Sequence, residues 1–413
     1  MNILEARRLV AASRAGARHA RAALASAALA ALLSSCGGGA SSAPPADDDV
    51  VIPPAPASAL FAQGAGFHDT LLVTGQQRDA IAAYAQAMGA PAGAMFYTDL
   101  AGQGGLQSAL GGGGGCGDAG VQDLPSFLAA ASPHAVIQLG LALTGGEMTQ
   151  LAGGQLDAAA RRLAETLRAT GHPVLLRIGY EAEGPWNAYS APTYARGFRR
   201  LVAILRGASV GGQAIAAVPN VATVWHLAAS SQAMPDYGSA SLSPWYPGDD
   251  AVDWVGVSWF GEGGIAGLES ADARARDGVA AFALAHAKPL MIAESAPRDW
   301  RPSGNADPDP PDAATSWQSW YAPVLAWAAA HDVRVWSYID QDWHAFPMFA
   351  GSCGNGGDIW GDSRVEQPGS TVRAAWAAQL QPGAPVRRLR VDEPSTWCDA
   401  GVACQASAGM PKQ

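Results

Sequence analysis

The stretch Pro173-Val-Leu-Leu-Arg-Ile-Gly-Tyr-Glu-Ala-Glu-Gly-Pro-Trp-Asn187 opens as an apolar β-type run with one arginine, and it ends in a carboxylate followed by Gly, Pro and Trp. Alternate side chains of a strand share a face. We therefore expect Arg177, Gly179 and Glu181 on one face and the apolar residues on the other. Charged side chains at the C-terminal end of a buried strand are typical of a (β/α)8 barrel, because chemistry in that fold gathers where the strands end.

Short apolar runs of this kind alternate with Ala-rich helical patterns along most of the chain. Eight runs with helices between them predict one closed parallel barrel over residues 61–380, a length that suits this fold. An open, doubly wound sheet is the alternative, but no Gly-x-Gly-x-x-Gly pattern follows the first run. The expected strands are 71–76, 93–98, 135–142, 173–180, 221–225, 253–259, 289–293 and 333–339. The clearest expected helices are 155–169, 192–206, 271–286 and 316–330.

Residues 1–36 have the pattern of a targeting segment. An Arg-rich stretch precedes an apolar run from Ala22 to Leu33, which is too short to span a bilayer comfortably. The run ends in Leu-Ser-Ser-Cys36, which resembles a bacterial lipoprotein signal with Cys36 as the lipidated residue. We expect an exported protein, held at the outer membrane through that lipid or lying in the periplasm or on the cell surface. A plain secretory signal or a membrane anchor is the alternative.

Two segments flank the expected barrel. Residues 37–60 are rich in Gly, Ser, Ala and Pro, which predicts a disordered tether. Residues 381–413 show little periodicity, so we expect a tail that packs on the barrel. Four cysteines besides Cys36 suggest two disulfides in an exported chain, with three possible pairings. The favoured pairs are Cys398 with Cys404, which are close in sequence, and Cys116 with Cys353, which both lie in Gly-rich loops.

Composition excludes several classes of partner. The net charge of −10 argues against nucleic acid, which would need a basic face. The sequence has no Cys-x-x-Cys and no His/Cys cluster with metal-ligand spacing, so we expect no metal. The 14 Trp suit stacking on the flat apolar faces of sugars where they follow expected strands, although ordinary core packing accounts for about half of them.

Two glutamates end expected strands on opposite sides of the barrel mouth. Glu181 ends the fourth strand, and Glu294 ends the seventh in Lys288-Pro-Leu-Met-Ile-Ala-Glu294. Glycoside hydrolysis uses two such carboxylates, of which one protonates the leaving oxygen and the other attacks, or activates water, at the anomeric carbon. A salt bridge or a helix cap is the ordinary role of a single glutamate at a strand end, but the pair favours catalysis.

Three ordered segments resemble glycoside hydrolase family 26, a family of retaining β-glycanases that includes β-mannanases, β-1,3-xylanases and mixed-linkage glucanases. Arg177-x-x-x-Glu181-x-x-Gly184-x-Trp186 is similar to the family's Arg-x-x-His-Glu-x-x-Gly-x-Trp segment. Residues 246–256 resemble its entry into the sixth strand, and residues 288–294 resemble its nucleophile segment. The resemblance implies a barrel with Glu181 as acid/base, Glu294 as nucleophile and no cofactor.

The sequence departs from that family at two positions. Tyr180 stands where the family has a histidine before the acid/base glutamate. Phe260 stands where the family has a tyrosine whose hydroxyl helps to hold the nucleophile, and we expect Tyr338 or Trp259 to take over part of that role. Both positions lie beside the reacting sugar, so β-mannan, β-xylan, β-glucan and an exopolysaccharide all stay open as substrates.

Other side chains are expected at the rim because of their positions. Arg177 would supply a positive field or a structural ion pair, and His226 would hydrogen-bond a sugar hydroxyl or lie in the core. Glu183 is the less favoured acid, because only Glu181 has the motif spacing. Trp336 or Trp343 is the favoured aromatic floor. The expected substrate contacts are Arg177, Tyr180, Trp186, Asn187, Trp225, His226, Trp259, Trp336, Tyr338 and Trp343.

These observations predict a monomeric, lipid-anchored glycoside hydrolase that cleaves β-linked polysaccharide or oligosaccharide with retention. Retention requires carboxyl groups about 5–5.5 Å apart, and inversion about 6.5–9.5 Å. A catalytically silent glycan-binding lipoprotein on the same barrel is the alternative from another class. A hydrolase that trims the cell's own exopolysaccharide is a third hypothesis.

Overall fold

The structure is a computed structural model of the 413-residue chain. The expected signal segment, the tail and all five cysteines lie outside the residues that it describes, and so do the expected disulfides and the expected lipidation site. Within the expected tether 37–60, Val50 and Ile52 pack against the hydrophobic core, so this part contacts the domain. The described residues are 50–55, 70–74, 80–89, 91–111, 120–131, 135–260, 266–297, 317–347, 349, 361–367 and 369–380.

Eight parallel strands form a single sheet, in the order β1-β8-β7-β6-β5-β4-β3-β2. Strands β1 and β2 at the two ends of this order contact each other, which closes the barrel. The predicted (β/α)8 barrel is therefore confirmed. The strands are β1 (Thr70–Thr74), β2 (Gly93–Asp99), β3 (Val136–Ala142), β4 (Val174–Ile178), β5 (Val221–Leu227), β6 (Trp254–Trp259), β7 (Leu290–Ser295) and β8 (Val333–Ile339).

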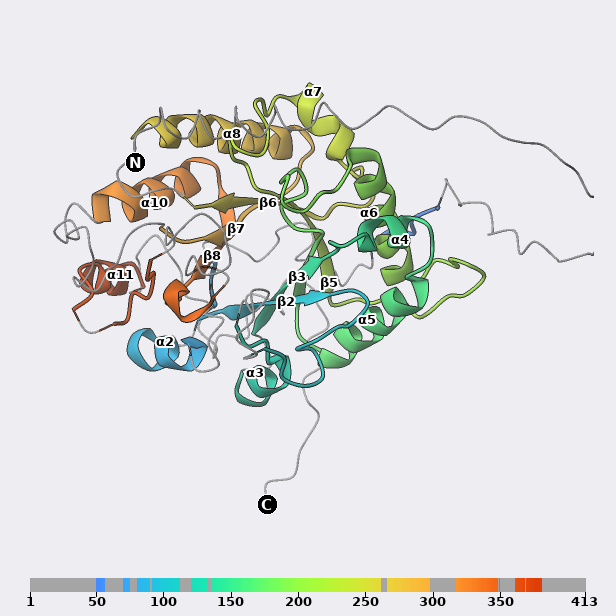
Figure 1. Cartoon of the computed structure of the whole chain (residues 1–413), viewed down its shortest axis with the longest axis horizontal. Coiled ribbons are helices and arrows are strands. Elements are labelled where there is room, and N and C mark those ends of the chain that lie inside the picture. Colours follow the sequence, from blue (N-terminus) through green and yellow to red (C-terminus); the bar gives the residue numbers. More distant parts are fainter. Residues whose placement is uncertain are drawn as a thin grey trace, which may run out of the picture. The chain divides into compact units, whose positions relative to one another are not determined.

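Helices surround the strands on the outside of the barrel (Figure 1). Their amphipathic faces explain this arrangement: α5 buries Leu163 and Leu167 and ends at Gly171, whose φ of 67° suits a left-handed helix cap. None of the described helices is long and apolar enough to cross a membrane. The helices are α2 (Ala80–Met88), α3 (Leu124–Ala130), α4 (Glu147–Ala152), α5 (Asp157–Thr170), α6 (Ala191–Leu205), α7 (Ser239–Leu242), α8 (Ala266–Ala285), a π-helical turn (Trp317–Tyr321), α10 (Ala322–Ala330) and α11 (Arg373–Gln379).

The alternation of side chains divides the core into an inner and an outer layer. Residues such as Leu176 and Ile178 face the helices and belong to the large outer core. Their neighbours in sequence face the barrel interior, where one layer is apolar and the next, toward the C-terminal strand ends, is polar. The apolar inner layer consists of Ala92, Val136, Leu175, Ala222, Val224, Trp254, Met291, Ala293 and Val335.

Strand β4 ends earlier than expected, and this changes how the chain reaches the site. It stops at Ile178, not at Tyr180, and Gly179 has a φ of 57°. A Cβ on Gly179 would lie 2.7 Å from the Met148 side chain, so the turn requires glycine for both reasons. Glu181 therefore leaves the strand through a tight turn, and simple alternation along an extended strand does not position it.

Candidate active site

Arg177 lies at the centre of the polar layer inside the barrel. Its side chain is fully buried and forms an ion pair with the carboxylate of Glu294 across the interior. Gly140 on β3 is paired with Arg177, and a Cβ there would lie 2.6 Å from the guanidinium. The Arg177 guanidinium carbon also lies 5.0 Å from the centre of the Tyr97 ring and 5.3 Å from that of Tyr180. A permanent cation is thus held beside one glutamate and between two aromatic rings.

Glu294 points into the barrel because β7 contains a bulge. Val257 of β6 pairs with Ile292, but the next residue, Ser258, pairs with Glu294, so Ala293 is an extra residue in β7. The bulge places Glu294 on the same inward face as Ser258. Strict alternation from Ile292, which faces the helices, would have turned Glu294 outward. Bulges commonly redirect a side chain next to an active site, and this one does so here.

Glu181 is held in the turn after β4 in an uncommon backbone conformation. Its φ is 50°, a left-handed value that costs a non-glycine residue free energy. The amide of Asn187 donates to the backbone carbonyls of Tyr180 and Glu181, at 2.9 and 3.1 Å, and so braces this turn. Asn187 is buried and uses its amide donor on the backbone, so it supports this turn.

Both carboxylate oxygens of Glu181 accept hydrogen bonds. Ser258 Oγ donates to Oε1 at 2.8 Å, and Trp186 Nε1 donates to Oε2 at 2.7 Å. These two bonds favour the ionised form, but burial and then the negative charge of Glu294 raise the pKa of Glu181 to about 8. Glu181 is therefore a carboxylic acid at neutral pH, as a general acid must be.

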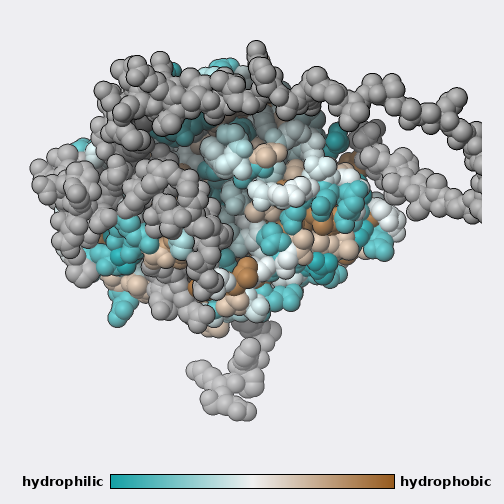
Figure 2. Space-filling model, viewed as in Figure 1, coloured by the Kyte–Doolittle hydropathy of each residue, from teal (hydrophilic) through white to brown (hydrophobic). Residues whose placement is uncertain are grey.

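The spacing Glu-x-x-Gly-x-Trp has a direct physical cause. Trp186 folds back over Gly184 to reach Glu181, and a Cβ on Gly184 would lie 2.5 Å from the indole ring. The indole remains 52% exposed. Few other large apolar side chains among the described residues are exposed to this extent. Figure 2 shows hydrophilic and apolar side chains mixed over one face of the molecule. An exposed indole beside a protonated glutamate is suited to contact a sugar ring.

Glu183, the less favoured acid, has a different role. Its carboxylate accepts hydrogen bonds from the backbone of Ala228 and Ala229, at 3.0 and 2.9 Å, and from the Tyr237 hydroxyl at 2.8 Å. All of these bonds tie the turn after β4 to the segment after β5. The geometry thus favours Glu181 over Glu183 as the acid.

His226 is fully buried inside the barrel, between two other polar side chains. Its Nδ1 lies 3.3 Å from Nη1 of Arg177, and its Nε2 lies 3.0 Å from Oγ of Ser258. Burial, followed by the charge of Arg177, lowers its pKa well below the ordinary value. His226 therefore contacts protein groups on both sides, and the prediction that it binds a sugar hydroxyl is not supported by this placement.

Tyr97 and Tyr180 form the aromatic part of the site. Their ring centres lie 5.6 Å apart, nearly perpendicular to each other. Burial, followed by the charge of Glu294, raises the pKa of both hydroxyls, so both are neutral hydrogen-bonding groups. Tyr180, which replaces the family's histidine, thus contributes a neutral ring and hydroxyl beside Arg177.

Four predicted substrate contacts lie outside the site, because their side chains face the helix layer. Trp225 packs against Tyr246 and Phe282, and Trp259 packs against Trp327 with the Arg276 guanidinium 3.6 Å from its ring centre. On β8, Trp336 and Tyr338 pack against Trp376 of α11. The four residues that the structure places on the outer face of the strands are Trp225, Trp259, Trp336 and Tyr338.

The same placement excludes both candidates for the role of the tyrosine missing at position 260. Tyr338 directs its hydroxyl to the backbone carbonyl of Ser363 at 2.5 Å, and Trp259 faces the helices, so neither can hold Glu294. The expectation that one of them does so is wrong. Among the described residues, Arg177 is the side chain that forms an ion pair with Glu294.

Trp343 is the one predicted aromatic of the β8 side that lies toward the barrel mouth. It belongs to a small cluster with Met95, Ala296 and Ile339, against which Phe260 and Tyr97 pack. Its Nε1 donates to Ser363 Oγ at 2.9 Å, and only 2% of the residue is exposed. Trp343 therefore forms a buried base beside the site.

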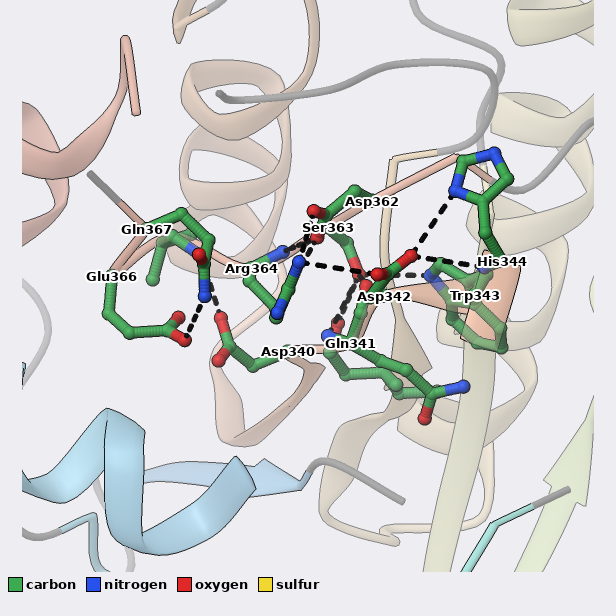
Figure 3. Close-up of polar contacts among 12 residues, drawn as sticks. Asp340, Gln341, Asp342, Trp343, His344, Asp362, Ser363, Arg364, Glu366 and Gln367 are labelled. Carbon is green, nitrogen blue, oxygen red and sulfur yellow. Dashed lines mark hydrogen bonds and ion pairs between the residues drawn. The ribbon is translucent and has the colours of Figure 1, made fainter. Parts of the chain in front are cut away.

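The segment over residues 361–367 braces this rim. Asp342 pairs with Asp362 in an antiparallel bridge, and its carboxylate contacts His344 and Arg364 (Figure 3). Burial, followed by the neighbouring Glu366, raises the pKa of Asp340 well above its ordinary range. These contacts brace the polar turn after β8 against the segment that follows the strand.

Three polar side chains of the barrel interior were not among the sequence candidates. Tyr97 lies beside Arg177, Ser258 contacts Glu181, and Gln138 spans the interior from β3 to the backbone of Ala293 at 2.6 Å. Gln138 and Ser258 are each a polar residue in an otherwise apolar parallel strand, and this is the signal that would have identified them. The described residues contain no group of three or more metal-ligating side chains.

Comparisons with known proteins show similarity in sequence and in fold. No family model matches the chain. It is 29% identical over 308 residues to a β-1,3-xylanase from Alcaligenes sp. and equally to a β-1,3-xylanase, TXYA, from Vibrio sp.. The match covers 72% of this chain but only 60% and 61% of those proteins.

A solved structure has the same fold. The modular endo-β-1,4-mannanase from Cellulomonas fimi, a glycoside hydrolase family 26 enzyme, aligns over 80% of this chain and 77% of its own. The TM-score is 0.53 and the identity 16%. The chain thus shares the fold of this family 26 enzyme, as the resemblance in sequence implied.

Proposed function

We propose that this protein is a retaining β-glycoside hydrolase, with Glu181 as acid/base and Glu294 as nucleophile. One observation carries the proposal: two carboxyl groups at the ends of β4 and β7 lie in opposite electrostatic environments. Glu181 has a pKa of about 8 and is protonated at neutral pH, whereas Glu294 is paired with a buried arginine. Such a division between two carboxyl groups assigns the acid and the nucleophile.

The residues support a two-step reaction. In the first step the Glu294 carboxylate attacks the anomeric carbon, and Glu181 gives its proton to the departing glycosidic oxygen. In the second step Glu181 takes a proton from water, the water oxygen bonds to the anomeric carbon, and Glu294 leaves as a carboxylate. Glu294 carries no charge while it is esterified, so its contribution to the high pKa of Glu181 disappears. Glu181 is then better suited to act as a base.

The substrate class that we propose is a β-linked polysaccharide. Two relatives at 29% identity are β-1,3-xylanases, so β-1,3-xylan is the first candidate within this class. The exposed indole of Trp186, hydrogen-bonded to Glu181, supports contact with a sugar ring next to the scissile bond. A neutral tyrosine at position 180 and a phenylalanine at 260 distinguish this site from the family motif.

The test is a panel of polysaccharides, with β-1,3-xylan, β-mannan and mixed-linkage β-glucan, incubated with the full chain. We expect reducing ends from at least one of them and, by NMR of early products, the β-anomer first. Glu294→Gln should lose activity by at least about 10⁴-fold. Glu181→Gln should lose about 10²–10⁴-fold on polysaccharide, and less on an aryl glycoside whose leaving group needs no proton.

Two outcomes would contradict the proposal. The α-anomer as first product would replace retention by inversion. Binding of a polysaccharide without turnover, unchanged in both variants, would identify a glycan-binding protein.

We further propose that Cys36 is lipidated and holds the exported protein at the outer membrane. The support is the Leu-Ser-Ser-Cys sequence after an apolar run. In a Gram-negative host, the full chain should fractionate with outer membranes and incorporate labelled fatty acid. Cys36→Ala should abolish the label and release the protein, and a label that persists in this variant would refute the site.

A further inference from the structure

Ser258 and His226 are buried next to Glu181 and Arg177, and they take no part in the reaction steps described above. Ser258 Oγ lies 2.8 Å from Oε1 of Glu181 on one side and 3.0 Å from His226 Nε2 on the other. His226 Nδ1 in turn lies 3.3 Å from Nη1 of Arg177, which pairs with Glu294. These contacts form one continuous hydrogen-bonded chain between the nucleophile and the acid/base, through the barrel interior.

The chemistry of each member fixes the direction of its hydrogen bond. An arginine can only donate, so Nδ1 of His226 must accept and the ring proton must be on Nε2. Nε2–H then donates to Ser258 Oγ, which leaves the serine hydroxyl proton for Glu181. A neutral imidazole is required for this order, and burial together with the Arg177 charge favours that form.

We propose that Ser258 is a positioning residue for the acid/base glutamate, with its hydroxyl oriented by Arg177 through neutral His226. The inference rests on the proposed function, because it takes Glu181 as the acid/base. The hydroxyl aims the carboxyl group and stabilises its ionised form, which the second reaction step needs. One buried arginine thereby orients both glutamates.

The environment of Glu181 sets the sign of the expected effect. Burial, Glu294 and Glu183 raise the pKa of Glu181, whereas the hydrogen bonds from Ser258 and Trp186 lower it. Removal of the Ser258 hydroxyl should therefore raise this pKa further. The titratable and charged groups that face the site from the packed elements are Tyr97 on β2, Arg177 on β4, Tyr180 and Glu183 in the turn after β4, His226 on β5 and Glu294 on β7.

The kinetic test compares Ser258→Ala with the unmodified full chain, on soluble β-1,3-xylan. The basic limb of the kcat/KM profile reports the general acid, and we expect it to move up by about one pH unit. Ser258→Thr keeps a hydroxyl and should restore the limb. Ser295→Ala removes a buried hydroxyl of β7 that bonds to the Ser337 carbonyl, and should leave the limb in place. A folded Ser258→Ala protein with an unmoved limb would overturn the inference.

Two NMR measurements test the inference without a substrate, and the first of them uses only the unmodified chain. Nitrogen-15 NMR of the unmodified chain should show His226 as the neutral Nε2–H tautomer from about pH 5 to 8, the range in which a histidine normally titrates. An Nδ1–H tautomer or a protonated ring would overturn the proposal. Carbon-13 NMR titration of Glu181 should show the upward shift in Ser258→Ala even if no polysaccharide is hydrolysed. That result would support the hydrogen bond from Ser258 to Glu181 and contradict only the proposed function, so the two failures are distinguishable.

Discussion

The inner wall formed by β4 to β7 and the outer face of β8 both carry polar or aromatic side chains near their strand ends. In the wall, Arg177, His226 and Glu294 point into the barrel and contact one another or share a partner. On β8, Trp336 and Tyr338 point toward α11 and pack around Trp376. The two regions differ in the direction of these side chains. A polar or aromatic residue near a strand end belongs to the site only when its side chain points into the barrel.

The two regions also differ in how they affect stability. Aromatic side chains on the outer face of β8 bury large apolar surfaces and contribute to stability. The wall instead buries charged groups, whose desolvation costs free energy that a partner must offset. Glu181 adds a left-handed backbone conformation to this cost. The polar inner wall thus lowers the stability of the barrel, and the apolar burial on the outer face of β8 offsets part of this loss.

The largest expected effect comes from Arg177→Met, which removes the cation at the centre of the wall. Breaking a buried ion pair leaves an unpaired charge and should lower the free energy of unfolding by about 3–5 kcal/mol. The loss of the charge beside Glu294 should also lower kcat/KM, on the order of 10²–10³-fold. Chemical denaturation and kinetics on the active polysaccharide measure the two effects.

Arg206→Met is the matched control. Arg206 forms a comparably buried ion pair with Asp253 at 2.9 Å, but Asp253 precedes β6, at the N-terminal end of the strands. We expect a similar loss of stability with kcat/KM unchanged. If both variants lose activity equally, the Arg177 pair is only structural and the contrast between the two regions fails.

Much of this fold follows from the sequence, since all eight strands lie where apolar runs predict them. The bulge at Ala293 does not, because it depends on how β7 pairs with β6 and leaves no mark in the β7 sequence itself. Without that bulge, alternation from Ile292 would turn Glu294 away from the site. Its position at the end of an expected strand, together with the resemblance to a known motif, identified this glutamate, although strict alternation alone would have turned it outward.

The aromatic predictions failed on β8 for a related reason. A tryptophan at a strand end suits both sugar stacking and packing against a helix, and composition cannot separate these two roles. Trp336 is an example, because its partner Trp376 lies 40 residues later on α11. Ser258 was not among the predicted site residues. A single serine in an apolar strand does not indicate a site by itself, and its role follows only from its contact with Glu181 in the structure.

The smallest effects are expected when one aromatic side chain from each region is substituted and the activities and stabilities of the two variants are compared. Trp186→Phe removes the indole N–H that donates to Glu181, but this half-exposed side chain contributes little to stability. We expect kcat/KM to fall about tenfold, the value of one hydrogen bond to the charge that develops on Glu181 as it gives up its proton, with the midpoint of thermal unfolding unchanged. Tyr338→Phe removes a buried hydroxyl that bonds to Ser363 and Tyr321. It should cost about 1 kcal/mol of stability and leave kcat/KM unchanged. If the two variants exchange these effects, the outer face of β8, and not the wall, contacts the substrate.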